Sequence, residues 1–72
     1  MTERLTTEQV IAMLVRKITE AGSAARVAEQ IGVSPAYLSY VVNGYKIPSE
    51  TICEFLGVRR VRVAQIYYER IK

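Results

Sequence analysis

The sequence predicts a small, mainly helical domain of about four helices followed by a C-terminal β-strand. Apolar residues recur at helical spacing along most of the chain, a serine or threonine precedes each such run, and glycine or Asn-Gly follows it. The chain has 72 residues, of which 50% are hydrophobic and 24% charged, a composition typical of a globular domain rather than a disordered or disulfide-rich one. We therefore expect residues 1–72 to form a single domain.

The first helix is predicted to begin directly after Thr6. Thr6 suits the N-cap position, Gln9 completes a capping box three residues later, and Leu5 with Val10 can form a hydrophobic staple. One apolar stripe follows at helical spacing, formed by Val10, Met13, Leu14 and Ile18. Gly22 then supplies the signal that ends the helix.

Two short helices are predicted next, with only a short turn between them. Ser23 can cap the first, and Gly32 can adopt the left-handed conformation that ends it. Ser34 suits the N-cap of the second, and Pro35 stands at the first helical position, where its missing N–H is not needed. This helix is expected to run from about Pro35 to Asn43. The apolar positions of the pair are Val27, Ala28, Ile31, Leu38, Val41 and Val42.

A fourth helix and a tail complete the expected elements. Ser49 can cap the fourth helix and Gly57 can end it, with Ile52, Phe55 and Leu56 buried. The tail, at about residues 59–71, is rich in β-branched and aromatic residues and alternates valine with arginine, which favours a strand. A rough helical spacing also exists, through Val58, Val61, Gln65, Tyr68 and Ile71. We favour the strand.

The composition also narrows the classes of function. The chain has no histidine and one cysteine, Cys53, so it lacks the commonest general base and cannot form an internal disulfide. We expect no enzyme activity, no cofactor, no metal and no small-molecule ligand, with Cys53 a core residue. Since no apolar run approaches the roughly 18 residues of a membrane span, and the N-terminus has no apolar signal segment, we expect a cytoplasmic protein. The net charge of +3 favours a polyanionic partner.

The segment at about residues 24–43 has the features of a helix-turn-helix. A tight helix pair needs a small residue where the helices cross and a flexible residue in the turn, and Ala28 and Gly32 meet these needs. The run AARVAEQIGVSPAYLSYVVNG resembles the Cro/repressor-type helix-turn-helix family of phage and bacterial transcription regulators, over residues 23 to 57. The resemblance implies a lambda repressor/Cro-like fold, and a homodimer that binds a double-stranded DNA operator.

The resemblance also implies which residues contact DNA. Base edges would be contacted by Pro35, Ala36, Ser39 and Tyr40. The DNA backbone would be contacted by Ser23, Arg26, Ser34, Tyr37, Asn43, Tyr45 and Lys46. Exposed tyrosine and serine with few charges are unusual on a solvated helix, but they suit a helix that faces bases, thymine methyl groups and sugars.

The tail supplies the expected dimer interface. A strand that pairs with its copy across a two-fold axis would bury Val61 and Val63 and cover an otherwise open edge. The residues that we assign to dimerisation are Val61, Val63, Ile66 and Tyr68.

Several of these residues also have a purely structural interpretation. Tyr37 could pack against Leu14 or Ile18, and Asn43 could end its helix in a left-handed conformation. The arginines at 59, 60 and 62 could be charges that protect an edge strand from unwanted pairing. Exposed tyrosines are also enriched at protein interfaces. The alternative function is therefore a protein-interaction module on the same scaffold, of the antitoxin or anti-repressor type.

Overall fold

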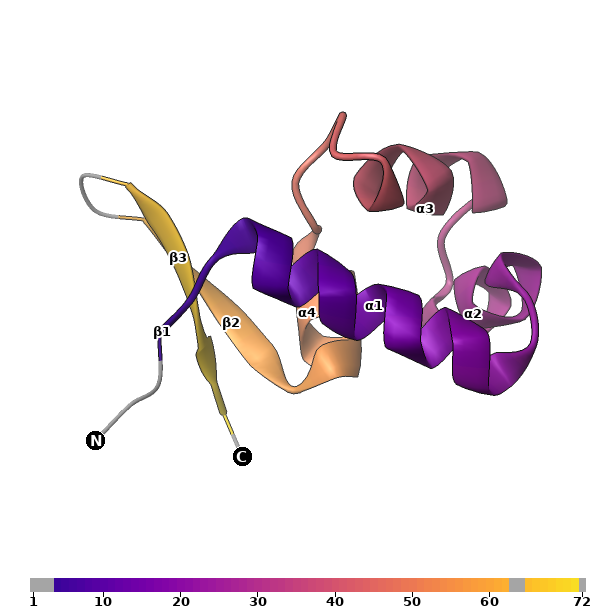
Figure 1. The fold of residues 1–72 in the computed structure, drawn as a ribbon, viewed down its shortest axis with the longest axis horizontal. Coiled ribbons are helices and arrows are strands. Elements are labelled where there is room, and N and C mark those ends of the chain that lie inside the picture. Colours follow the sequence, from indigo (N-terminus) through magenta and orange to yellow (C-terminus); the bar gives the residue numbers. More distant parts are fainter. Residues whose placement is uncertain (1–3, 63–64, 72) are drawn as a thin grey trace.

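Four helices pack beside a small β-sheet in the computed structural model, which describes residues 4–62 and 65–71 (Figure 1). The helices are α1 (Thr7–Ala21), α2 (Ala24–Ile31), α3 (Pro35–Val42) and α4 (Glu50–Leu56). The strands are β1 (Arg4–Leu5), β2 (Val58–Arg62) and β3 (Ile66–Arg70), with β3 in the middle of the sheet. The predicted fold class is confirmed. Within the described ranges, no helix has both the length and the apolar character needed to cross a membrane.

The helix ends lie where the sequence predicts them, with one exception. In each of the four helices, the N-cap side chain accepts a hydrogen bond from the backbone N–H three residues later, and the caps are Thr6, Ser23, Ser34 and Ser49. The capping box at Thr6 is complete, since Gln9 accepts from the Thr6 backbone N–H at 2.8 Å. Three glycines with positive φ end α1, α2 and α4, namely Gly22, Gly32 and Gly57.

The exception is the end of α3. Asn43 has a φ of −86°, so the interpretation of a left-handed Asn43 is wrong; the positive φ, of 83°, belongs to Gly44. Glycine adopts this conformation without the steric cost of a Cβ atom. Asn43 instead stays within the last turn, where its side-chain amide donates to the Ser39 carbonyl at 2.8 Å.

The tail forms a β-hairpin rather than the single strand that we expected. Strands β2 and β3 pair antiparallel from Val58↔Arg70 to Arg62↔Ile66, and the chain reverses between them. The strand prediction for residues 59–71 is therefore right in type but incomplete, and Val63 lies outside the described residues. The two-residue strand β1 was not predicted. It pairs with β3, with Leu5 opposite Tyr68.

One apolar core joins the helices to the sheet. Its fully buried side chains are contributed by α1 to α4, β2 and β3, and include Val10, Leu14, Val27, Ala28, Leu38, Val41, Ile52, Val58 and Tyr68. Tyr68 is the largest of them, and its hydroxyl accepts a hydrogen bond from the Thr7 hydroxyl at 3.3 Å. Met13, Ile18, Val42 and Phe55, expected in the core, lie half-buried against it. Cys53 is buried as predicted, and this burial raises the pKa of its thiol.

The left-handed C-cap of α2 can be tested at Gly32. Its φ is +91°, and nothing lies within 4 Å of the position that a Cβ atom would take. Replacing Gly32 with alanine should therefore lower the free energy of unfolding by roughly 1–2 kcal/mol through backbone conformation alone. Gly32→Asn should cost clearly less, because asparagine tolerates this region better. Urea denaturation measures both values, and an unshifted alanine variant would contradict the C-cap.

Candidate nucleic-acid interface

The outer face of α3 is open to solvent and carries no charged side chain. Helix α3 lies at the rim of the molecule, next to α2 and above α1 in Figure 1. Leu38 and Val41 are fully buried on its inner side. On the outer side, the four residues assigned to base contacts are all exposed: Pro35, Ala36, Ser39 and Tyr40. The fold thus brings the predicted base-facing residues together on one accessible surface.

The turn between α2 and α3 fixes how this surface is presented. The backbone N–H groups of Gly32 and Val33 both donate to the Ala28 carbonyl, at 2.8 and 3.0 Å. Ala28 itself is fully buried, and α3 packs against α2. The Ser34 hydroxyl then accepts from the Tyr37 N–H at 3.1 Å and starts α3 at once. This arrangement is a compact helix-turn-helix.

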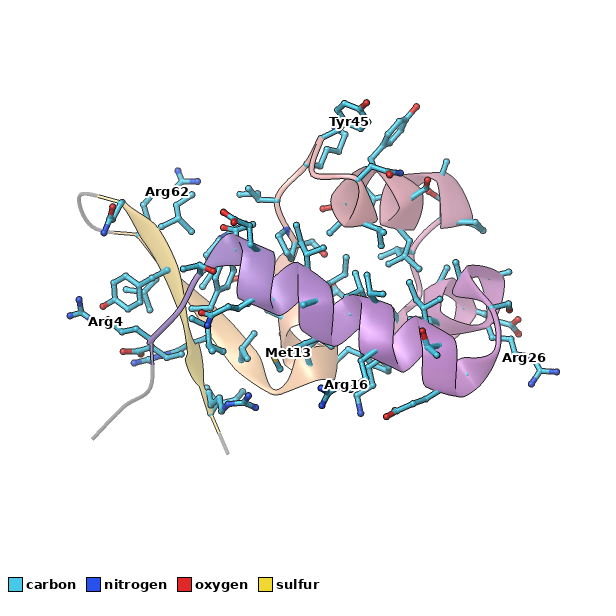
Figure 2. All side chains as sticks on the ribbon, in the orientation of Figure 1. Arg4, Met13, Arg16, Arg26, Tyr45 and Arg62 are labelled. Atoms are coloured by element: carbon cyan, nitrogen blue, oxygen red, sulfur yellow. The ribbon has the colours of Figure 1, made fainter. Side chains whose placement is uncertain are left out.

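Two tyrosines form an exposed aromatic pair at the C-terminal end of α3. The rings of Tyr40 and Tyr45 meet edge to face, with centroids 6.5 Å apart, and the side chains are 50% and 79% exposed. The Tyr45 N–H also donates to the Tyr40 carbonyl at 2.9 Å, which fixes the loop to the helix. In Figure 2, Tyr45 projects from the top of the molecule, beside the end of α3. The pair offers apolar ring surface together with two hydroxyl groups.

The loop that follows α3 is held at its base by two side chains. The Tyr37 hydroxyl donates to the Ile47 carbonyl at 3.1 Å, and Arg60 Nη1 donates to the Pro48 carbonyl, also at 3.1 Å. Pro48 itself is fully buried. These two hydrogen bonds hold the loop at Ile47 and Pro48, next to the exposed residues Tyr45 and Lys46. Sequence reasoning missed Arg60, because its contact with Pro48 exists only when β2 folds beside the loop.

Tyr37 accordingly has a structural position rather than a free one. Its side chain is half-buried against the core, and its hydroxyl is hydrogen-bonded within the chain. These surroundings fit a packing role for Tyr37 better than a role in direct contact with a ligand. Any influence of Tyr37 on the outer surface is exerted through the loop that it holds.

The other residues predicted to contact the DNA backbone are spread over a wider area. Asn43 and Lys46 are exposed near the end of α3, and Ser34 is exposed at its start. Ser23 is half-buried, and its hydroxyl accepts from the Arg26 N–H as the N-cap of α2. Arg26 is exposed, but Figure 2 shows it pointing away from the molecule far from Tyr45. The structure therefore does not bring Arg26 close to the loop.

The residues assigned to dimerisation also lie in different settings. Val61 is half-buried on β2, an outer strand of the sheet, directly opposite Tyr67 of β3. Ile66 is half-buried and packs against the core. Tyr68 is fully buried within its own chain, so its side chain is not on the surface. Of the three described residues of this set, Val61 is the best placed to contact a partner, because it lies on an outer strand.

A cavity of about 200 Å³ lies between α4 and the sheet, apart from α3. It is lined by Glu50, Cys53, Glu54, Val58, Arg59, Arg60 and Ile71. None of these residues belongs to the outer face of α3. Among the described residues, no group of three or more cysteine, aspartate or glutamate side chains is arranged to hold a metal ion.

Comparison with known proteins identifies the same part of the chain. A family model described as helix-turn-helix matches residues 20–61. The matched span includes α2, α3, the loop after α3 and α4, and it ends within β2. Neither the curated proteins nor the solved structures gave a match to this chain.

The hydrogen bond from Tyr37 to the loop can be tested by removing one hydroxyl group. Tyr37→Phe should lower the free energy of unfolding by about 0.5–1 kcal/mol, because the Ile47 carbonyl loses its donor. Tyr45→Phe is the matched control, since the Tyr45 hydroxyl has no partner among the described residues. Chemical denaturation of both variants provides the measurement. Equal effects of the two substitutions would show that the Tyr37 hydroxyl does not hold the loop.

Proposed function

This chain belongs to the Cro/repressor-type helix-turn-helix family, because the family match covers more than half of its 72 residues, and we propose that it binds a double-stranded DNA operator as a homodimer. Membership of the family makes the chain a DNA-binding transcription regulator in general. The operator, the dimer and a phage or prophage type of regulation are our proposal. The observation that carries it is the open, uncharged outer face of α3.

In the proposed complex, α3 enters the major groove and its outer face reads the bases. Pro35 and Ala36 are small, so the start of the helix can approach base edges closely. The Ser39 hydroxyl can donate or accept, and the Asn43 amide lies 3.3 Å from it and orients it. The ring of Tyr40 can contact a thymine methyl group or a sugar, and Tyr45 supports that ring from the side.

Contacts to the DNA backbone supply the affinity in this proposal. Lys46 stands in the loop whose base is fixed by Tyr37 and Arg60, so its charge is held near the end of α3. Tyr45, Asn43 and the N-cap serines at 23 and 34 can donate hydrogen bonds to phosphate oxygens. Arg26 would contact phosphates at the far end of α2. Such contacts are independent of sequence and weaken as salt increases.

The proposed dimer forms through the open edge of β2. In the order β1-β3-β2, strand β3 is paired on both sides, whereas β2 has one side without a described partner strand. A second copy can pair there antiparallel about a two-fold axis, with Val61 near the interface. Ile66 and Tyr68 would support the hairpin from within. A single small domain buries little surface when it binds DNA. The two domains of a dimer would bind two half-sites about one helical turn apart.

A second candidate function is favoured by the aromatic pair. Tyr40, Tyr45 and Ile47 expose apolar surface at the end of α3, and a protein partner could also bind such a surface. This is the antitoxin or anti-repressor type of module. Duplex DNA separates the two functions: a regulator binds random duplexes with a steep salt dependence, and an interaction module does not.

Base and backbone contacts can be separated with two substitutions. The preferred site is first identified by selection from a random DNA pool. Tyr40→Ala should cost roughly 1–3 kcal/mol on that site and much less on random DNA, because Tyr40 faces the bases. Lys46→Ala should weaken binding to both duplexes alike and reduce the salt slope by about one per protomer. Titrations at several salt concentrations measure both quantities.

The outcome for Tyr40 decides between the two functions. An unchanged ratio of specific to random binding in Tyr40→Ala would exclude sequence reading by this residue. If Tyr40→Ala instead abolishes binding to a protein and leaves DNA binding intact, the interaction module is the better description.

The β2 edge can be tested with a single charge at the proposed two-fold axis. Val61→Lys places two like charges near each other in the dimer, and we expect its dissociation constant to rise by roughly tenfold or more. Val15→Lys is the control, because Val15 is 40% exposed and belongs to α1 rather than to the sheet. Sedimentation equilibrium gives the mass of each variant. A Val61→Lys protein that dimerises like the control would require a different interface.

A further inference from the structure

Arg62 is an exposed cation on β2 that lies just beyond the span of the family match. Its side chain makes no hydrogen bond, ion pair or ring contact with any described residue, although its backbone belongs to the ladder with β3. The other arginines of the sheet are engaged within the chain: Arg59 with Glu69, Arg60 with Pro48, Arg4 with the ring of Tyr67, and Arg70 with a partner of its own. Within the described sheet, Arg62 is thus the guanidinium that is available to a ligand.

The pleat of β2 places Arg62 on the same side as the loop after α3. Side chains at i and i+2 of a strand share one face, so Arg62 lies on the face from which Arg60 reaches the Pro48 carbonyl. Arg59 lies on the opposite face, where it pairs with Glu69 at 2.6 Å. Arg62 is therefore about 7 Å further along the strand than the residue that contacts the loop.

The figure shows the same relation in space. In Figure 2, Arg62 projects toward the top of the molecule, which is also the side from which Tyr45 projects at the end of α3. Arg4, Arg16 and Arg26 point to other sides in this view. A long, rigid polyanion that contacts α3 and its loop would therefore also approach Arg62.

We propose that Arg62 binds a DNA phosphate beside the helix-turn-helix, so that the DNA-binding surface continues from α3 onto strand β2. This inference rests on the proposed function. A guanidinium presents parallel N–H donors that match two phosphate oxygens, and it stays charged at all physiological pH values. Arg60, through its bond to Pro48, keeps β2 and the loop in a fixed relation. Arg62 and Lys46 would then engage the DNA as two points of one rigid surface.

Removing the charge at Arg62 is the direct test. Arg62→Ala should weaken binding to the preferred and to a random duplex by the same factor, roughly fivefold at 0.1 M salt, and should lower the salt slope by about 0.9 per protomer. Arg62→Lys keeps the charge and should preserve the slope while losing the paired donors. Arg16→Ala is the matched control, since it removes the same charge from an exposed position that faces another side.

The possible results distinguish this inference from the function on which it rests. If the wild-type chain binds duplex DNA and Arg62→Ala behaves like Arg16→Ala, the phosphate contact is overturned and the proposed function stands. If the wild-type chain shows no salt-dependent binding to duplex DNA, both are overturned. Thermal unfolding of all variants controls for folding. Arg62 is exposed, so we expect unchanged melting. Should the alanine variant be unstable, Arg62→Gln repeats the test, because it also removes the charge.

Discussion

The burial of Tyr68 against α1 is the interaction on which the rest of the structure depends. The domain is small, and a sheet whose first strand has two residues has little stability of its own. Tyr68 lies in the central strand between Leu5 and Arg60, is fully buried, and bonds through its hydroxyl to Thr7. It thereby fastens the sheet to the helices. Strand β2 pairs with β3 and packs on α4, so this contact also helps to hold Arg60 beside the loop that carries Lys46.

Local signals predict most of the helical part of the fold. An N-cap requires one side-chain oxygen and one backbone N–H three residues later, and a left-handed C-cap requires one glycine. Both features therefore depend on only a few adjacent residues. The four caps and the glycine stops at 22, 32 and 57 were predictable for this reason. The exposed side of α3 was predictable too, because Leu38 and Val41 fix the direction of the core.

Contacts between distant parts of the chain could not be predicted in the same way. Strand β1 has two residues and carries no periodic pattern, and its partner strand lies at the other end of the chain. The pairing within the tail was missed because the sequence between the two strands contains no Asn-Gly or Asp-Gly pair. The bonds from Tyr37 and Arg60 to the loop carbonyls also depend on the assembled fold. At the end of α3, either Asn43 or Gly44 could adopt the left-handed conformation, and the sequence pattern alone did not show that Gly44 does so.

The distribution of charge indicates how one small domain could combine affinity with specificity. A cation on the reading face of α3 would be attracted to any phosphate and would stabilise misplaced complexes as well as the correct one. That face instead carries proline, alanine, serine and tyrosine, whose contacts are favourable only when the helix is seated against suitable bases. The cations proposed for the phosphates lie outside α3, Lys46 in the loop that follows it and Arg62 on β2, and Arg60 holds this strand and loop together. In the proposed complex, the positions of these two cations on the phosphates set the register in which the uncharged face of α3 meets the bases. The sequence-independent attraction to phosphates thereby positions the residues that recognise the sequence.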